Sequence, residues 1–142
     1  MKENKLRSTI VASINKSNNC HASPIESEVS PGFPDINMVL LGVEMNAELK
    51  TIRGPEGSYE VEPTQIGWGK ARAKSAGIVL WVLVIQAPYE VFITLGCPHT
   101  GSGKFKFDRK TWTDAENGCV VYEGEPKEWA RALFAAAQSF AP

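Results

Sequence analysis

The amino-acid sequence predicts an α/β fold in which helices flank a mixed central sheet. The eight apolar residues of Ile78–Ile85 do not alternate with polar ones, which is typical of a strand covered on both faces. A helix-like stretch precedes this run and a strand-like stretch precedes that helix, so the three predict a βαβ unit with parallel strands. The chain has 142 residues, 43% apolar and 22% charged, as expected of one globular domain spanning residues 1–142.

The first third of the chain predicts a helix, an edge strand and a hairpin. Residues 3–17 place apolar side chains at helical spacing and predict an amphipathic helix. Residues 20–28 alternate loosely and predict an edge strand. The runs 36–41 and 43–52 predict the two strands of a β-hairpin that turns on Gly42–Val43.

The next stretch predicts a loop and then the crossover helix. Residues 53–58 are polar and turn-forming, and predict a surface loop. Pro63 stands where a first helical residue is favoured and Gly77 where a helix stops, so residues 64–76 predict a short helix.

The last third of the chain predicts two strands and a final helix. The strands are expected at 91–95 and 120–122, and the stretch 96–111 between them shows no clear pattern. A helix is expected to begin at Pro126, with four apolar side chains on one face: Trp129, Leu133, Ala136 and Phe140.

Charge and cysteine content exclude several classes of protein. The net charge is -1, so no overall positive field attracts nucleic acid or anionic lipid, and phosphate binding has to be local or metal-mediated. No run of 18 apolar residues predicts a membrane span, and Thr9–Ala12 is too short for a signal-peptide core. Cys20, Cys97 and Cys119 are odd in number and widely spaced, which indicates reduced thiols. We therefore expect a cytoplasmic protein.

A pattern of acidic and basic residues on the hairpin predicts a metal site. Acid-x-Lys occurs four times, but only Glu48-Leu49-Lys50 lies on a strand that follows a Pro-Asp pair, Pro34-Asp35. The expected register places Asp35 opposite Lys50, and residues two apart share a face, so Asp35, Glu48 and Lys50 are expected to project together. Two carboxylates form a hard-oxygen site suited to Mg²⁺ or Mn²⁺, and a lysine beside them can hold a water or stabilise charge on a phosphate.

These motifs resemble a known nuclease superfamily. Pro34-Asp35, a twelve-residue gap, Glu48-Leu49-Lys50-Thr51 and then Pro63-Thr64-Gln65 at the head of a helix are similar to the PD-(D/E)XK pattern. Within that superfamily the chain resembles the small VRR-NUC proteins of phages and bacteria, which are relatives of archaeal Holliday-junction resolvases. The resemblance covers roughly residues 3–95, leaves 96–142 as a C-terminal elaboration, and implies a restriction-endonuclease-like sheet.

The resemblance also implies roles for individual residues. Asp35 and Glu48 would bind the metal together with the Leu49 carbonyl. Lys50 would position water or stabilise the transition state, and Gln65 would orient the lysine or the water. The superfamily usually adds a glutamate from the first helix, for which Glu3 is the candidate, with Glu26 and Glu28 as substitutes.

The function implied by the resemblance is metal-dependent hydrolysis of DNA phosphodiester bonds. The expected enzyme is a Mg²⁺- or Mn²⁺-dependent endonuclease of a bacterial or phage-infected cell. Its substrate would be branched DNA such as a Holliday junction, and its state a homodimer.

Two groups of basic residues are candidates for DNA contact. One group surrounds the predicted site and comprises Arg53, Lys70, Arg72 and Lys74; the other comprises Lys104, Lys106, Arg109 and Lys110. For each group the alternative is an ordinary solvated face, and for Trp68 and Trp81 the favoured interpretation is core packing. If DNA binds, its affinity should fall steeply with salt.

Other interpretations remain open at this stage. Asp35 could be a turn residue, and Glu48 with Lys50 an exposed ion pair that contributes roughly 0–1 kcal/mol. The chain could then be a non-catalytic nucleic-acid-binding or assembly domain of the same fold, or a protein-interaction module. Two further patterns are weak, because Gly101–Lys104 lacks the spacing of a phosphate loop and the Cys-His pairs lack four-ligand zinc spacing.

Overall fold

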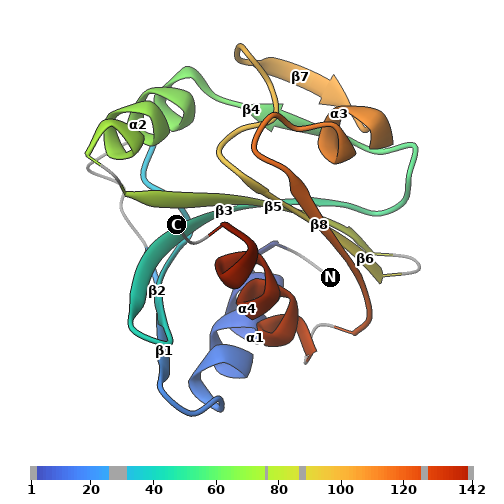
Figure 1. Ribbon diagram of the computed structural model, residues 1–142. Coiled ribbons are helices and arrows are strands. Elements are labelled where there is room, and N and C mark those ends of the chain that lie inside the picture. The colour runs from blue at the N-terminus through green and yellow to red at the C-terminus, as the bar shows by residue number, and fades with distance from the viewer. Residues whose placement is uncertain (1–2, 26–31, 76, 87–88, 126–127, 141–142) are drawn as a thin grey trace.

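The computed structural model describes residues 3–25, 32–75, 77–86, 89–125 and 128–140. A six-stranded sheet forms the centre of the molecule, with helices on both of its sides (Figure 1). Its strands lie in the spatial order β1 (Cys20–Pro24), β2 (Ile36–Leu40), β3 (Val43–Ile52), β5 (Ile78–Gln86), β6 (Tyr89–Leu95) and β8 (Cys119–Glu123). A separate two-stranded ribbon pairs β4 (Ser58–Val61) with β7 (Gly103–Lys106).

The predicted βαβ unit is confirmed. Strand β3 leads through helix α2 (Pro63–Lys74) to β5, and β5 pairs parallel with β3 from Met45↔Ile78 to Ile52↔Ile85. The other pairs in the six-stranded sheet are antiparallel, so the sheet is mixed. Residues 79–85 of β5 are buried, as the uninterrupted apolar run predicts.

Each face of the sheet has its own apolar core. Helices α1 (Glu3–Asn15) and α4 (Trp129–Phe140) lie on one face, where Leu6, Leu133 and their neighbours are fully buried. Helix α2, helix α3 (Arg109–Thr113) and the β4–β7 ribbon lie on the other face. The core there includes Tyr59, Trp81 and Trp112. Trp81 is thus confirmed as a core residue, at 2% exposure.

The hairpin turn lies one residue earlier than expected. Leu41 and Gly42 both have positive φ, 51° and 84°, which is the conformation of a two-residue type I′ turn. The predicted turn on Gly42–Val43 is wrong because it would put a β-branched valine into a left-handed conformation. Leu41 is 54% exposed and therefore takes that position without losing core contacts.

The corrected turn changes which residues face each other. Asn37 pairs with Asn46 instead of Glu48, and Asp35 falls beside Glu48 instead of Lys50. The pairing shifts by two residues, and side chains alternate with a period of two. Asp35, Glu48 and Lys50 consequently remain on one face, as the sequence predicts.

Several elements differ from the predicted ones. The ribbon β4–β7 and helix α3 were not expected, because their short segments show no clear periodicity. The edge strand β1 ends at Pro24, and residues 26–28 of the predicted strand lie outside the described residues. Helix α4 begins at Trp129, and its predicted start at Pro126 also lies outside them. None of the described helices is long and apolar enough to cross a membrane.

Candidate active site

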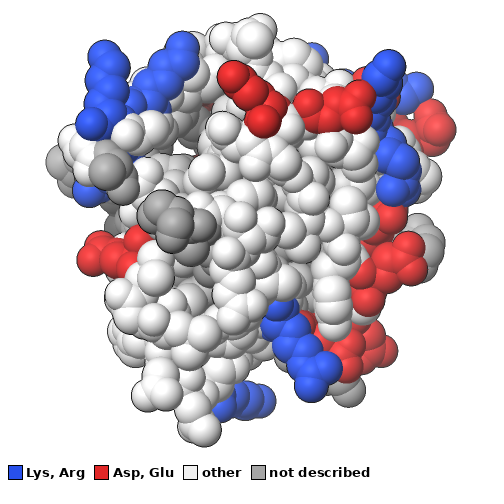
Figure 2. Space-filling model, viewed as in Figure 1, with Lys and Arg blue, Asp and Glu red and all other residues white. Residues whose placement is uncertain are grey.

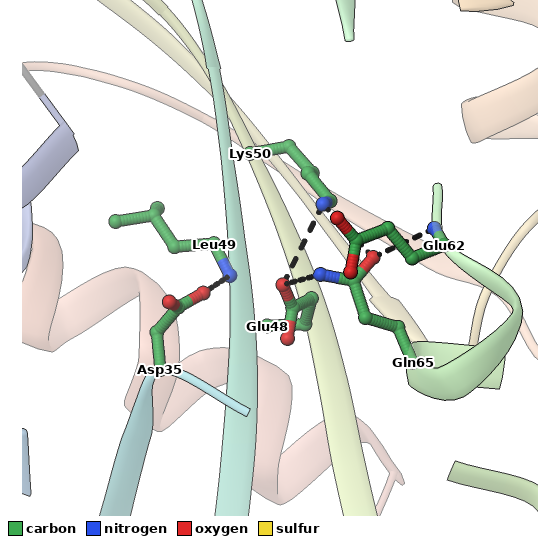
Figure 3. A network of polar contacts seen from close by, with 6 residues as sticks. All are labelled: Asp35, Glu48, Leu49, Lys50, Glu62 and Gln65. Carbon is green, nitrogen blue, oxygen red and sulfur yellow. Dashed lines mark hydrogen bonds and ion pairs between the residues drawn. The ribbon is translucent and has the colours of Figure 1, made fainter. Parts of the chain in front are cut away.

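Four polar side chains from three segments meet beside the second half of β3 (Figure 3). Asp35 stands just before β2, Glu48 and Lys50 lie on β3, and Gln65 lies in the first turn of α2. Two neighbouring strands and the crossover helix bring them together, although Asp35 and Gln65 are 30 positions apart. The proximity expected from the motifs is therefore present in the structure.

Gln65 links the acid to the lysine. Its Nε2 donates to Glu48 Oε1 at 2.8 Å, and its Oε1 accepts from Lys50 Nζ at 3.1 Å. Lys50 Nζ also lies 3.6 Å from Glu48 Oε1, so the three groups form a closed triangle of polar contacts. The ammonium is held toward the carboxylate by two contacts.

The start of α2 determines which way the Gln65 amide points. Pro63 occupies the first turn, and Gln65 Oε1 also accepts the backbone N–H of Glu62 at 3.0 Å. Because two donors already point at Oε1, this oxygen cannot face Glu48, and the amide presents Nε2 to the carboxylate instead. The geometry of the helix start thus orients a side chain of the site.

Asp35 is held by the backbone of β3. Its Oδ2 accepts the N–H of Leu49 at 2.7 Å, where the regular ladder between β2 and β3 ends. The N–H and C=O of one strand residue point to the same side, so the Leu49 carbonyl also points to the Asp35 edge. The Leu49 side chain is buried in the core on the opposite face.

When both of its acids are ionised, the site carries more negative charge than its lysine can balance. Burial raises the pKa of Glu48 to about 8, and the charge of Asp35 and a hydrogen bond with it act in the same direction, while Lys50 acts against them. The side chains of Glu48 and Lys50 are only 5% and 10% exposed, so solvent screens these charges weakly. A second cation would relieve this repulsion.

Glu3 also belongs to this neighbourhood. It is the first residue of α1, and the pKa of its carboxyl is raised by burial and then by the charge of Asp35, with Lys50 opposing. Glu3 in turn raises the pKa of Glu48. The structure therefore brings this glutamate close to the hairpin acids, whereas Glu26 and Glu28 lie outside the described residues.

The donor atoms suit a hard divalent cation. They are the carboxylates of Asp35 and Glu48, with the Leu49 carbonyl on the same edge, and oxygen ligands are those that Mg²⁺ and Mn²⁺ prefer. Across the part of the chain that the structure describes, no three His, Cys, Asp or Glu side chains stand close enough to hold a metal ion by themselves.

The basic residues expected near the site lie along and beside α2. Lys70, Arg72 and Lys74 are exposed on that helix, and basic side chains gather over α2 in Figure 2. Arg72 stacks on Trp68, with its guanidinium carbon 4.5 Å from the ring centroid. Arg53 is exposed just after β3. All four cations of this group are therefore on exposed surface.

The second basic group is partly neutralised. Lys106 lies 3.0 Å from Glu56, and Arg109 makes two hydrogen bonds with Glu90, at 2.6 and 3.0 Å. This arrangement favours the solvated-face interpretation for these residues. The stretch containing Lys104 forms strand β7 and is not followed by a phosphate-binding helix start.

Sequence reasoning missed a cleft next to the site. A cleft of about 390 Å³ lies between α2 and the β5–β6 end of the sheet, and Gln65, Trp81 and Cys97 line it. Burial is the main reason that the pKa of the Cys97 thiol is raised. The charge of Lys50 lowers this pKa and the charge of Glu48 raises it. The zinc interpretation of Cys97 and His99 has no metal cluster to support it among the described residues.

Comparison with known proteins places the fold. No protein-family model matches the chain, and no curated protein matches its sequence. Among solved structures, the chain is similar to Hjc, a Holliday junction resolvase from the archaeal hyperthermophile Archaeoglobus fulgidus. The TM-score is 0.55 and the sequence identity 11%, with 77% of this chain and 90% of that chain covered. The chain therefore has a resolvase-like, restriction-endonuclease-like α/β fold, in which helices flank a six-stranded mixed sheet.

Proposed function

We propose that the protein is a divalent-metal-dependent DNA endonuclease that hydrolyses phosphodiester bonds. The observation that carries the proposal is the convergence of Asp35, Glu48, Lys50 and Gln65 on one spot, where the buried Glu48 lies beside a second acid. The motif resemblance implies the same four residues, and the resolvase-like fold supports it. Hydrolysis needs no histidine in this arrangement.

Each residue of the site has a separate task. Asp35 and Glu48 would hold Mg²⁺ with the Leu49 carbonyl, and the ion would supply a water of lowered pKa and a counter-charge for the phosphate. Lys50 has its ammonium oriented by Gln65 and can donate to a phosphate oxygen as charge develops there. Glu3 adds a third carboxyl at the edge of the site.

The proposed substrate is branched DNA. A structural neighbour is a Holliday junction resolvase, and the exposed cations of α2 and Arg53 can contact phosphates of a DNA strand bound at the site. Two copies of such a site, in a symmetric homodimer, would allow paired cuts across a junction. The overall charge of -1 means that these local cations, rather than the whole surface, attract the DNA.

The proposal is tested by cleavage of a panel of DNA substrates. Wild-type protein with Mg²⁺ should cut a junction, flap or nicked substrate faster than linear duplex, and chelation should abolish the cutting. Asp35→Asn keeps an oxygen for the Leu49 N–H but removes the charge, so we expect a loss of about a hundredfold or more. Full activity of Asp35→Asn, or cutting that survives chelation, would refute the assignment.

A non-catalytic DNA-binding domain is the second candidate. It is favoured by one observation, the low exposure of the Glu48 and Lys50 side chains at 5% and 10%. It requires DNA retention that is independent of metal, with no cutting of any substrate in the panel. The same experiment therefore separates the two candidates.

Gln65 is expected to act by positioning its neighbours. Gln65→Ala removes both the amide on Glu48 and the acceptor for Lys50, so cleavage should fall by about 10- to 100-fold, as is usual for groups that orient metal ligands. Cleavage rates over a range of Mg²⁺ concentrations should show weaker metal affinity as well. Thr64→Ala changes an exposed neighbour in the same turn and should leave both quantities unchanged. Equal rates for the two variants would contradict the role.

A further inference from the structure

The cleft beside α2 is a partly open, mostly apolar space. Its volume of about 390 Å³ falls in the range of roughly 300–1,000 Å³ that small organic ligands occupy in proteins. Helix α2 has no fully buried residue; Ile66 and Trp68 are only partly buried against the core of this face, and the cleft lies beside them. The apolar part of the lining consists of Ile66, Ile78, Val79, Trp81 and Leu95.

The cleft borders the polar site at Gln65. Gln65 lines the cleft and contacts both Glu48 and Lys50. Trp81 lies beside Glu48 in the β3–β5 register, and its ring centroid is 5.8 Å from Lys50 Nζ. A ligand in the cleft would therefore lie next to any phosphate held at the site.

A rigid polar group stands in another wall of the cleft. His99 lines it, stacks on Phe105 with ring centroids 3.7 Å apart, and places Nε2 2.5 Å from the Tyr59 hydroxyl. Trp112 Nε1 donates to the same hydroxyl at 2.9 Å. An indole can only donate, so the Tyr59 proton is best directed at His99 Nε2, which leaves the imidazole neutral with its proton on Nδ1. Burial lowers the pKa of His99, in agreement with a neutral ring.

One cation, Lys70, lines the cleft. Two more exposed cations of the same helix, Arg72 and Lys74, follow it in the sequence, and basic side chains gather over α2 in Figure 2. A ligand that combines an apolar flat ring with a negatively charged backbone matches this combination of walls and cations. A nucleotide has both, and a double helix is far too wide to enter.

We propose that the cleft holds one unpaired nucleotide of the DNA strand, with its base against the apolar wall and its phosphates toward Lys70 and the polar site. This inference rests on the proposed function and deepens it. It makes the preferred substrate a DNA strand with an extrahelical nucleotide next to the point of cleavage. His99 offers its Nδ1–H as a donor to the edge of the base, and contact with the apolar side chains of the wall supplies affinity for any base.

Two glycines of α2 provide a matched test. Gly69 lines the cleft, Gly67 does not, and a Cβ added at either position meets no atom within 4 Å. Both replacements by leucine should strengthen the helix by about 1 kcal/mol on propensity alone. Only Gly69→Leu places a side chain in the cleft.

The measurement is metal-free DNA binding by fluorescence anisotropy. The probes are a labelled duplex with one extrahelical 2-aminopurine nucleotide and the same duplex without it. We expect wild type and Gly67→Leu to bind the duplex with the extrahelical nucleotide at least about tenfold more tightly than the duplex without it. Gly69→Leu should lose this preference. If Gly69→Leu fails to fold by circular dichroism, Ala73→Leu fills the same cleft from the next turn.

The outcomes separate this inference from the proposed function. No preference in the wild type, or the same preference in the Gly69 and Gly67 variants, would overturn the nucleotide cleft even if the protein cuts DNA. A preference that Gly69→Leu removes would support the cleft even if no cutting occurs with Mg²⁺. Binding needs no catalysis here, so failure of the nuclease assignment leaves the measurement valid.

Discussion

Replacing Glu48 by glutamine is expected to lower metal-dependent cleavage by about a thousandfold or more, equivalent to roughly 4 kcal/mol of transition-state stabilisation. The substitution is nearly isosteric, and the new side chain still offers an Oε1 acceptor to Gln65 Nε2. What it removes is the charge that would hold the metal. Cleavage rates on the best substrate of the panel measure the loss directly.

A thermal unfolding series with Mg²⁺ distinguishes this cause from damage to the fold. Saturating metal should raise the melting temperature of the wild type. At a hundredfold excess of metal over Kd, the free energy of unfolding of the wild type should rise by up to about 2.7 kcal/mol, whereas that of Glu48→Gln should not change. Glu44→Gln is the matched control, because Glu44 is an exposed glutamate on the same strand and lies outside the site. A metal response that survives in Glu48→Gln would exclude Glu48 as a ligand.

Without metal, the free energy of unfolding of the wild type is expected to decrease as pH rises from about 4.5 to about 8. In the folded protein the pKa of Glu48 is raised to about 8 from an ordinary value of 4.5, mainly by burial and then by Asp35. Between these two pH values the Glu48 carboxyl holds its proton in the folded state but not in the unfolded state. Protonation therefore stabilises the fold at low pH, and this stabilisation is lost as the pH rises to about 8. Glu3, whose pKa is also raised, adds to the same slope.

Chemical unfolding at several pH values checks this expectation. The loss should amount to roughly 2–4 kcal/mol, and Glu48→Gln should flatten the curve and be more stable than the wild type at about pH 9. Mg²⁺ should flatten the wild-type curve as well, because a bound cation favours the ionised carboxylate. A wild-type stability that rises with pH over this interval would show that Glu48 is ionised and well compensated without metal.

The opposite effects of Glu48 on stability and activity have one physical cause. Glu48 is 4% exposed, and its carboxylate lies beside another acid. Ionisation of this carboxylate lowers the stability of the metal-free fold, and the same negative charge favours the binding of a dication. The cleft is lined by Gln65 and Trp81, which are neighbours of Glu48 and Lys50. Strained electrostatics of this kind are common at functional sites.

Much of the hairpin and its site follows from local pattern. The period of two places Asp35, Glu48 and Lys50 on one face even though the predicted turn was misplaced, because the error amounted to a shift of two residues. The turn itself was missed because a leucine with positive φ at Leu41 is uncommon, and sequence preference pointed to the glycine and the residue after it.

Contacts between distant segments were not predictable in the same way. The Tyr59–His99 hydrogen bond joins residues 40 positions apart, and the Trp112–Tyr59 bond joins residues 53 apart. Strands β4 and β7 are four residues long and show no usable periodicity. Their pairing brings Tyr59 and Phe105 together in the core of this face, and these two side chains hold His99 at the cleft.

The sequence by itself determined the α/β class, the crossover from β3 to β5, and the shared face of the three charged hairpin residues. Each of these depends on a local period or on residues that are neighbours in the chain. Only the tertiary structure decided that Gln65 bridges Glu48 and Lys50, that Glu3 approaches the acids, and that a cleft opens beneath α2. These features depend on how far a helix stands from a sheet and on which side chains fill the space between them, which no short stretch of sequence specifies.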